Sequence, residues 1–193
     1  MTGVVAALAL YGIGSLAVAG EPLTLVRYAP GLLLVTAVVW AAYWQPAVIV
    51  SDAGVTVRNV LRTVELPWPS IQRIDTRYAL TLITAYGSYA AWAAPAPGRI
   101  RSREASAAEL RGLPESTYGA AGSVRPGDLP TSPSGEAAAI VRRRWEALRD
   151  AGHLDDPRLE RDRPRTHLHW GTVALLATLA ALTIAALAGI HQR

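Results

Sequence analysis

The chain has 193 residues, of which 51% are apolar and only 18% are charged, and it contains no cysteine. Soluble domains carry about 25% charged residues, so this composition is typical of a chain with membrane-embedded parts. The lack of cysteine excludes a disulfide scaffold, a thiolate zinc site and a cysteine nucleophile. All 19 basic residues are arginines, and every charged residue except Glu21, Arg27 and Arg193 lies within residues 45–166. The two ends therefore resemble membrane segments, and the middle resembles a water-soluble domain.

Three windows are long and apolar enough to span a membrane, which requires about 20 predominantly apolar residues. They cover residues 3–20, 23–44 and 168–190. Aromatic residues of the kind found at membrane–water interfaces lie in or beside the second and third windows: Tyr28, Trp40, Tyr43, Trp44 and Trp170. We therefore expect three transmembrane helices, the first two forming a hairpin over residues 3–44.

The first window has a second interpretation as a cleaved signal peptide. The sequence Ala-Val-Ala at residues 17–19 resembles a small-residue cleavage site. A signal peptide, however, begins with basic residues, and no basic residue precedes this window. A retained helix, joined to the second helix by a tight turn at residues 20–22, is the preferred interpretation.

The distribution of arginines predicts how the chain is oriented. Lys and Arg near membrane spans favour the cytoplasmic side, and residues 45–166 hold all the arginines except Arg27 and Arg193. We therefore expect a multi-pass protein of a bacterial inner membrane. Its N-terminus and middle domain would be cytoplasmic, and its C-terminus would lie outside.

Residues 46–97 have the pattern of a small antiparallel β domain. Short runs rich in β-branched residues alternate with turn signals such as Asp-Ala-Gly at residues 52–54, as hairpins do. Two prolines interrupt the pattern at residues 67–70, because proline cannot donate to a sheet ladder. We expect about six short strands in a meander, at residues 47–50, 55–58, 63–66, 71–77, 80–85 and 89–93.

The rest of the middle region divides into three parts. Residues 98–130 are rich in Gly, Pro, Ser and Ala without a period and predict a flexible linker. Residues 131–154 predict an amphipathic helix that is capped by Ser132 or Ser134 and ended by Gly152. Its apolar residues recur at helical spacing and would cover the sheet: Ala137, Ile140, Val141, Trp145 and Leu148. Residues 155–166 predict a charged tether.

This arrangement resembles a known bacterial family. The residues that carry the resemblance are Val48, the run Asp52-Ala53-Gly54-Val55-Thr56-Val57-Arg58-Asn59, and then Arg62-Thr63, Pro67-Trp68 and Ile71. They are similar to the pleckstrin-homology-like (PH-like) domains of the low molecular weight protein antigen 6 type, in a membrane-anchored form. The resemblance implies an α+β membrane protein, in which a PH-like partial barrel with a capping helix accompanies the transmembrane helices and no catalytic residues are known.

Two basic groups are candidate binding sites. Arg58, Asn59 and Arg62 surround a predicted strand turn, where guanidinium groups could bind phosphorylated headgroups. The run Arg142, Arg143 and Arg144 lies on the predicted helix, either as its solvated face or in contact with anionic lipids. No metal site is expected, because histidines two residues apart, such as those at 167 and 169, do not share a helix face.

We therefore expect a non-enzymatic membrane protein that presents a cytoplasmic PH-like domain for protein or lipid binding. The alternative is an accessory subunit of a larger membrane enzyme or transporter, docked through its small-residue spans. Membrane lipids and a membrane or cytoplasmic protein are the expected partners. No cofactor is expected, and no nucleic-acid motif occurs to suggest such a partner.

Overall fold

The computed structural model describes residues 22–97, 113–118, 124–154 and 162–188, together with residues 3–4, 7, 11–12, 14–15 and 20. The chain divides into two compact units. A helical unit contains Met1–Gln45 and Leu168–Arg193, and a β unit contains Pro46–His167. The elements that position the candidate sites belong to the β unit, and the candidate membrane spans belong to the helical unit.

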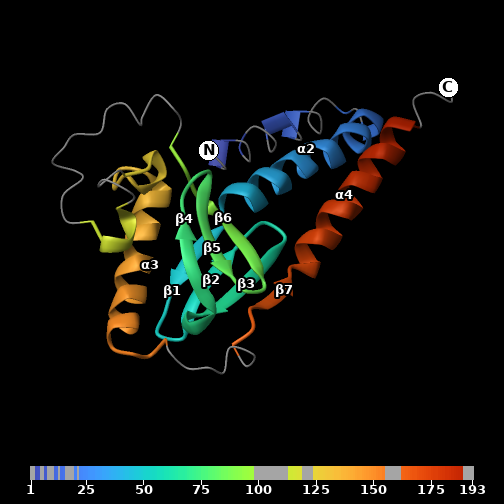
Figure 1. The fold of residues 1–193 in the computed structure, drawn as a ribbon. Helices are drawn as coiled ribbons and strands as arrows, with labels where there is room; N and C mark the ends of the chain where they lie inside the picture. Colours follow the sequence, from blue (N-terminus) through green and yellow to red (C-terminus); the bar gives the residue numbers. More distant parts are fainter. Residues whose placement is uncertain are drawn as a thin grey trace. The chain divides into compact units, whose positions relative to one another are not determined.

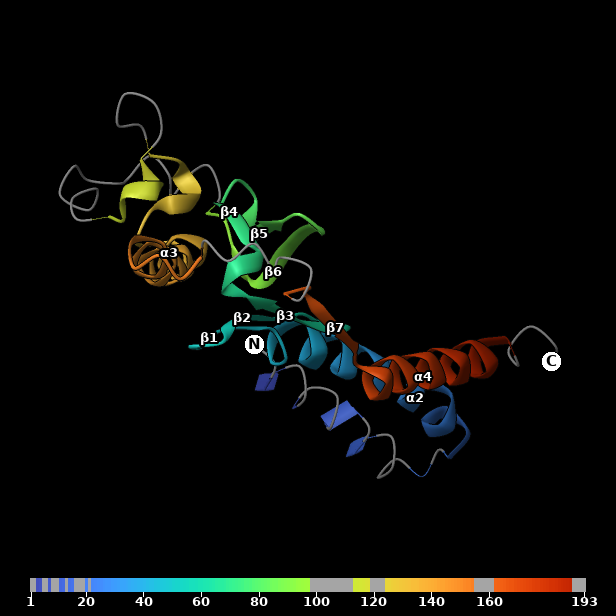
Figure 2. The same ribbon diagram turned by 60° about the horizontal axis from the view of Figure 1, so that its bottom comes forward.

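The helical unit pairs two long apolar helices. Helix α2 spans Pro22–Tyr43 and α4 spans Trp170–Ala188, and they lie side by side in Figures 1 and 2. A β-carbon added to Gly31 would lie 3.6 Å from the methyl group of Thr183. At the other end of the pair, Gln45 Nε2 donates to Thr172 Oγ1 over 3.1 Å. Residue numbers rise along one helix as they fall along its neighbour, so α2 and α4 are antiparallel.

The prediction of three transmembrane helices is wrong. Among the described residues, two helices are long and apolar enough to cross a membrane, Leu23–Tyr43 and Trp170–Ala188. Most of the window at residues 3–20 lies outside the described residues. The structure therefore does not test the choice between a retained helix and a signal peptide. The sequence criterion measured only length and apolarity. Gly12 and Gly14 lie inside that window, and a glycine costs about 1 kcal/mol relative to alanine in a helix interior, which length and apolarity do not count.

The β unit contains two antiparallel sheets rather than one meander. The first has the order β1-β2-β3-β7, and the second has the order β4-β5-β6. The strands of the first sheet are β1 (Ala47–Val50), β2 (Gly54–Arg58), β3 (Arg62–Pro67) and β7 (Arg165–Leu168). Those of the second are β4 (Ile71–Asp75), β5 (Ala79–Thr84) and β6 (Gly87–Pro95). The chain changes sheets at the 3-10 helix η1 (Trp68–Ser70), where the two prolines cannot continue a ladder.

Strand β7 is the part of this topology that the sequence pattern does not predict. It lies where we expected the end of the charged tether at 155–166 and the start of a span at 168. All four of its residues are exposed, so it has no apolar alternation from which a strand is predicted.

The core of the β unit lies between the two sheets and helix α3. Alternate residues of β2 and β5 point inward, and Val55 and Val57 on β2 and Leu80 and Leu82 on β5 are all fully buried. Helix α3 (Pro133–Asp150) adds Ala138 and Val141 to the same cluster. In Figure 2, which looks along the axis of α3, the helix lies beside the sheet of β4, β5 and β6.

Both ends of α3 are fixed by local hydrogen bonds. The side chain of Ser132 accepts from the backbone N–H of Gly135 over 3.0 Å, and Pro133 opens the first turn, where its fixed φ suits a helix. At the other end Gly152 adopts a φ of 73°, and His153 N–H donates to the carbonyl of Leu148. These caps are the ones that the sequence pattern predicts for Ser132 and Gly152.

Two short segments between β6 and α3 pack against the β unit. They contain the 3-10 helices η3 (Glu115–Thr117) and η5 (Pro126–Asp128). We expected residues 98–130 to form a flexible linker, yet Thr117, Asp128 and Leu129 are buried. A β-carbon at Gly127 would lie 1.9 Å from the carbonyl oxygen of Thr76. Glycine therefore allows η5 to approach the end of β4 backbone to backbone.

We predict that Gly127→Ala destabilises the β unit by about 1–3 kcal/mol or more, because the new methyl group meets a backbone atom that cannot move aside. Urea unfolding of the full chain in detergent micelles, followed by tryptophan fluorescence, measures this change. The matched control is Gly171→Ala, whose added β-carbon has open space around it. Equal stability of the two variants would contradict the predicted close approach.

Candidate binding surface

The turn between β2 and β3 carries the first predicted site. Ala47 of β1 pairs with Arg58 at the end of β2, and Arg58 pairs with Thr63 on β3. The backbone N–H of Asn59 donates to the carbonyl of Arg62 over 2.8 Å and closes the turn. Arg58 and Arg62 are both exposed, and neither forms an ion pair within the described parts of the chain. The structure therefore brings these two guanidinium groups to one exposed hairpin end.

Asn59 has a structural role at this turn. Its side-chain N–H donates to the carbonyl of Ala90 over 2.9 Å, and its side-chain oxygen accepts from the N–H of Trp92 over 2.8 Å. Both partners lie in an irregular stretch of β6, where the register against β5 shifts. A carboxamide has the donor and acceptor of a peptide group. The side chain of Asn59 therefore replaces the hydrogen bonds that a neighbouring strand would make with these two backbone groups, and it links the turn to β6.

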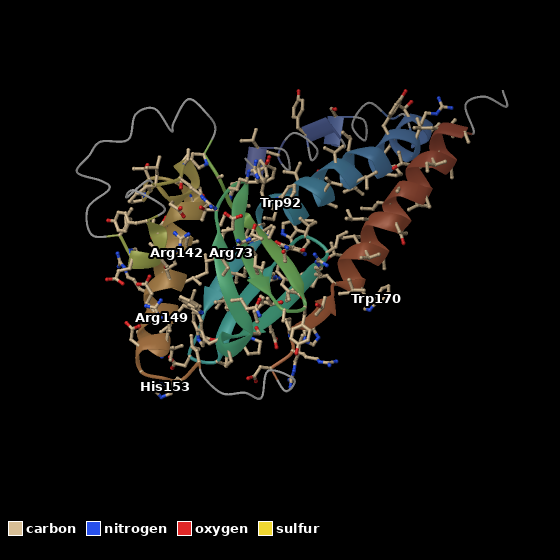
Figure 3. The ribbon with its side chains drawn as sticks, viewed as in Figure 1. Arg73, Trp92, Arg142, Arg149, His153 and Trp170 are labelled. Carbon is tan, nitrogen blue, oxygen red and sulfur yellow. The ribbon has the colours of Figure 1, made fainter. Side chains whose placement is uncertain are left out.

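Two large apolar side chains lie exposed beside the arginines. Leu61, at the tip of the turn, is 46% exposed, and Trp92 of β6, labelled in Figure 3, is 62% exposed. Neither residue is among the site residues that the sequence predicts. Trp92 lies on the face of β6 opposite to its neighbour Ala91, which is buried in the core, because adjacent strand residues point to opposite faces. We call Arg58, Leu61, Arg62 and Trp92 the turn patch.

The second predicted site, the arginine run on α3, is divided by the structure. Arg142 is buried, and its Nη1 donates to Asp128 Oδ1 over 2.6 Å and to Thr117 Oγ1 over 3.2 Å. Arg143 is exposed, and exposed Arg144 pairs with Asp52 over 2.6 Å. Because consecutive helix residues point about 100° apart, three adjacent arginines cannot share one face. Arg142 is therefore part of the protein interior, and Arg143 and Arg144 are at the surface.

The buried guanidinium of Arg142 joins several parts of the β unit. Its Nη2 also donates to the carbonyl of Ile74 on β4 over 3.4 Å, and Asp128 accepts a further hydrogen bond from the hydroxyl of Thr76 over 2.6 Å. Figure 3 labels Arg142 on α3 and Arg73 on the adjacent strand β4. A buried ion pair is retained only when its hydrogen bonds are satisfied, and here the carboxylate and the guanidinium both have additional neutral partners.

A cleft of about 280 Å³ lies on another part of the β unit. The residues around it come from the β1–β2 turn, β2, β3 and the segment that leads into β7: Ser51, Ala53, Gly54, Val55, Thr56, Glu65, Leu66, Pro67, Asp162, Arg163 and Arg165. Two carboxylates and two guanidinium groups face this space, so their formal charges balance. In the described residues, no group of three or more His, Cys, Asp or Glu side chains could hold a metal ion.

Residues 45–131 match the family model described as a bacterial PH domain. This segment is a bacterial PH-like domain. The match confirms the resemblance to a bacterial PH-like family and fits the two antiparallel sheets. It also extends through η3 and η5, in agreement with their packing against the PH-like domain. The comparisons with curated proteins and with solved structures find no match.

We predict that Arg142→Met destabilises the PH-like domain by about 3–5 kcal/mol, because it leaves the Asp128 carboxylate buried without a charge partner. Tryptophan fluorescence during urea unfolding reports this loss, since Trp68 lies in the core. The double variant Arg142→Met with Asp128→Leu removes both charges and should recover much of the stability. Exposed Arg143→Met is the matched control, and a loss of similar size there would contradict the assignment.

We predict that Asn59→Ala lowers the stability of the PH-like domain by about 1–2 kcal/mol, because two backbone groups of β6 lose their hydrogen-bond partners. Asn59→Asp keeps an acceptor for Trp92 N–H but places a carboxylate oxygen against the Ala90 carbonyl, where two acceptors repel each other, so it should not recover the lost stability. The neighbouring exposed variant Arg62→Ala should change stability by less than about 0.5 kcal/mol. If Asn59→Ala changed stability as little as Arg62→Ala, the structural role of Asn59 at this turn would be refuted.

Proposed function

We propose that this protein is a non-enzymatic, membrane-anchored binding module. Helices α2 and α4 would hold the PH-like domain at the cytoplasmic surface of a bacterial cell membrane, where the domain binds a lipid or a protein partner. The observation that carries the proposal is the exposure of both apolar helices. In each candidate span only 6% of the apolar window is buried within the protein.

The exposed residues of α4 show why lipid is the appropriate solvent for these helices. Leu175, Leu182, Ile184 and Leu187 are each at least 45% exposed. Burying apolar surface contributes about 25 cal/mol per Å², so a helix in a soluble core hides its apolar residues. The side-chain hydroxyl of Thr183 donates to the carbonyl of Leu179 in its own helix over 2.7 Å. That internal pairing is what the hydrocarbon interior of a bilayer requires of polar groups.

The antiparallel pairing of α2 and α4 supports a position for the PH-like domain on one side of the membrane. The domain follows the C-terminal end of α2 and precedes the N-terminal end of α4, and these two ends lie together at the Gln45–Thr172 hydrogen bond. Only residues 44–46 separate α2 from β1, and only His169 separates β7 from α4. Such short tethers give the domain a high effective concentration toward membrane partners.

The cytoplasmic side is supported by charge, and the binding role by the family. Apart from Arg27 and Arg193, all the arginines lie between the two helices, and arginines near membrane spans favour the cytoplasm. PH domains are binding modules for proteins or lipids, so binding is the activity that the domain would contribute here.

We predict a specific pattern of thiol accessibility for single cysteines, which are clean probes because the natural chain has no cysteine. In cells, a membrane-impermeant maleimide should label Gln192→Cys without permeabilisation. It should label Tyr78→Cys, at a side chain that is 77% exposed in the PH-like domain, only after the membrane is opened. The cysteine-free chain is the control for background. Labelling of Tyr78→Cys in intact cells would contradict the orientation, and recovery of the chain in the soluble fraction would contradict the anchoring.

A further inference from the structure

We propose that the turn patch docks the PH-like domain onto the anionic headgroups of the membrane that anchors it. This inference rests on the proposed membrane anchoring and names the surface and the ligand class that follow from it. The docking is a contact with the charged bilayer surface rather than the recognition of one headgroup.

The composition of the turn patch matches a bilayer surface. It combines two large exposed apolar side chains, Leu61 and Trp92, with the two exposed guanidinium groups of Arg58 and Arg62. Surfaces that lie in the membrane interface pair basic groups, which meet lipid phosphates, with Trp and Leu, which enter the headgroup–acyl boundary. No Asp or Glu occurs in residues 53–64 or 87–97, so the elements of the patch contribute positive charge alone.

Chain connectivity keeps the turn patch close to the membrane at any angle between the two units. Helix α2 ends at Tyr43, β1 begins at Ala47, and Ala47 pairs with Arg58 across the sheet. An extended chain covers at most about 3.6 Å per residue, and paired strand residues lie about 5 Å apart. The Arg58 backbone therefore stays within roughly 20 Å of the end of α2.

The end of α2 belongs to the headgroup region itself if the helix spans the bilayer. Tyr43 and Trp44 are 68% and 75% exposed there, as expected of aromatic side chains at a membrane–water interface. Electrostatic attraction acts over a Debye length of about 8–10 Å at physiological ionic strength. The distance of roughly 20 Å is the fully extended limit, so with the reach of an arginine side chain added the lipid phosphates come within range of Arg58 and Arg62 when the connecting residues are less than fully extended.

The turn patch is also held in a fixed shape before any contact. The side chain of Asn59, between the two arginines in sequence, is bonded to Ala90 and Trp92 on β6. These bonds hold the tip of the turn and the strand that carries Trp92 together, so docking orders little additional backbone. Binding by a preformed surface costs less conformational entropy than binding by a loop that must first be ordered.

A lipid surface fits these groups better than a free phosphate or a protein. A phosphate site gathers convergent donors in a pocket, whereas Arg58 and Arg62 flank an exposed hairpin tip with apolar groups beside it. A protein partner would have to reach this place, whereas the proposed anchoring supplies the bilayer there permanently.

The test uses the full chain in lipid nanodiscs, with an environment-sensitive nitrobenzoxadiazole dye on the single cysteine of Leu61→Cys. In nanodiscs with one third phosphatidylglycerol, the dye emission should shift to the blue and increase relative to nanodiscs of phosphatidylcholine alone. High salt should reverse the shift, because it screens exposed charges. Arg58→Gln with Arg62→Gln should lower the docked-to-undocked ratio about 30-fold, from the usual contribution of a basic residue near an anionic membrane.

Two controls separate charge from fold and position. Arg58→Lys with Arg62→Lys should restore the shift, because a diffuse anionic surface requires charge and not the planar guanidinium fork. The dye on Ala53→Cys, an exposed position at the opposite end of β2 about 16 Å away, should show no response to phosphatidylglycerol. Near-UV circular dichroism of each variant confirms that the PH-like domain remains folded.

The other outcomes overturn the inference in distinguishable ways. An equal shift in both nanodisc types would show an apolar contact without anionic selection. No shift in either type, from a chain that has entered the nanodiscs, would refute docking by the turn patch and leave the anchoring intact. Loss of the shift in the lysine variant would indicate a specific guanidinium site on a lipid or protein. Failure of the chain to enter nanodiscs would refute the proposed function itself.

Discussion

The packing of helix α3 against the rest of the β unit depends on the hydrogen bonds and the ion pair of the buried Arg142 guanidinium. The guanidinium reaches Asp128 in η5, Thr117 in η3 and the carbonyl of Ile74 on β4 from its place on α3. Other polar contacts join these elements in pairs, such as Trp145 Nε1 of α3 to the Ile71 carbonyl and Ser134 Oγ to the Gly127 carbonyl, whereas the Arg142 guanidinium contacts all three. Removing a charge from water is costly, so this pair favours the one docking position of α3 that satisfies every group. The segments around η3 and η5 become part of the core through it.

The two units of the chain supply different parts of the proposed function. In that proposal the helices are the membrane anchor with two short tethers, and the PH-like domain carries a binding surface of only a few groups. A free domain could not hold a membrane through two arginines, since each exposed charge contributes only about 1 kcal/mol. In an anchored domain the same contact is intramolecular. A weak and reversible contact is then sufficient to set how the domain is oriented for a partner.

The strands could be predicted because their residues alternate. Val55, Val57, Val64 and Leu66 point inward, with polar residues between them, and the interruption at residues 67–70 is visible as two prolines. The two-sheet arrangement requires knowledge of long-range pairing, which alternation alone does not contain. Strand β7 is beyond prediction for a simpler reason, since its four exposed residues are held by a neighbouring strand and not by burial.

The candidate sites were predictable only in part. The position of Arg142 could have been derived in part from its spacing, because it follows Ala138, a residue of the buried face of α3, by four positions. Its partner Asp128 could not, because that residue lies in a segment without periodicity. The arginines of the β2–β3 turn were evident in the sequence. Leu61 and Trp92 were not, because a solvent-exposed apolar residue differs from a core residue only in its surroundings.

The contact between α3 and β4 affects how copies of this chain can associate. Strand β4 lies at the edge of its sheet, and its carbonyls at Ile71 and Ile74 accept hydrogen bonds from Trp145 and Arg142 of α3. An open strand edge is a template for pairing with another chain. Proteins confined to a membrane plane collide with their own copies far more often than proteins free in solution. By occupying this edge with its side chains, α3 prevents the β4 edges of neighbouring molecules from joining into a continuous sheet.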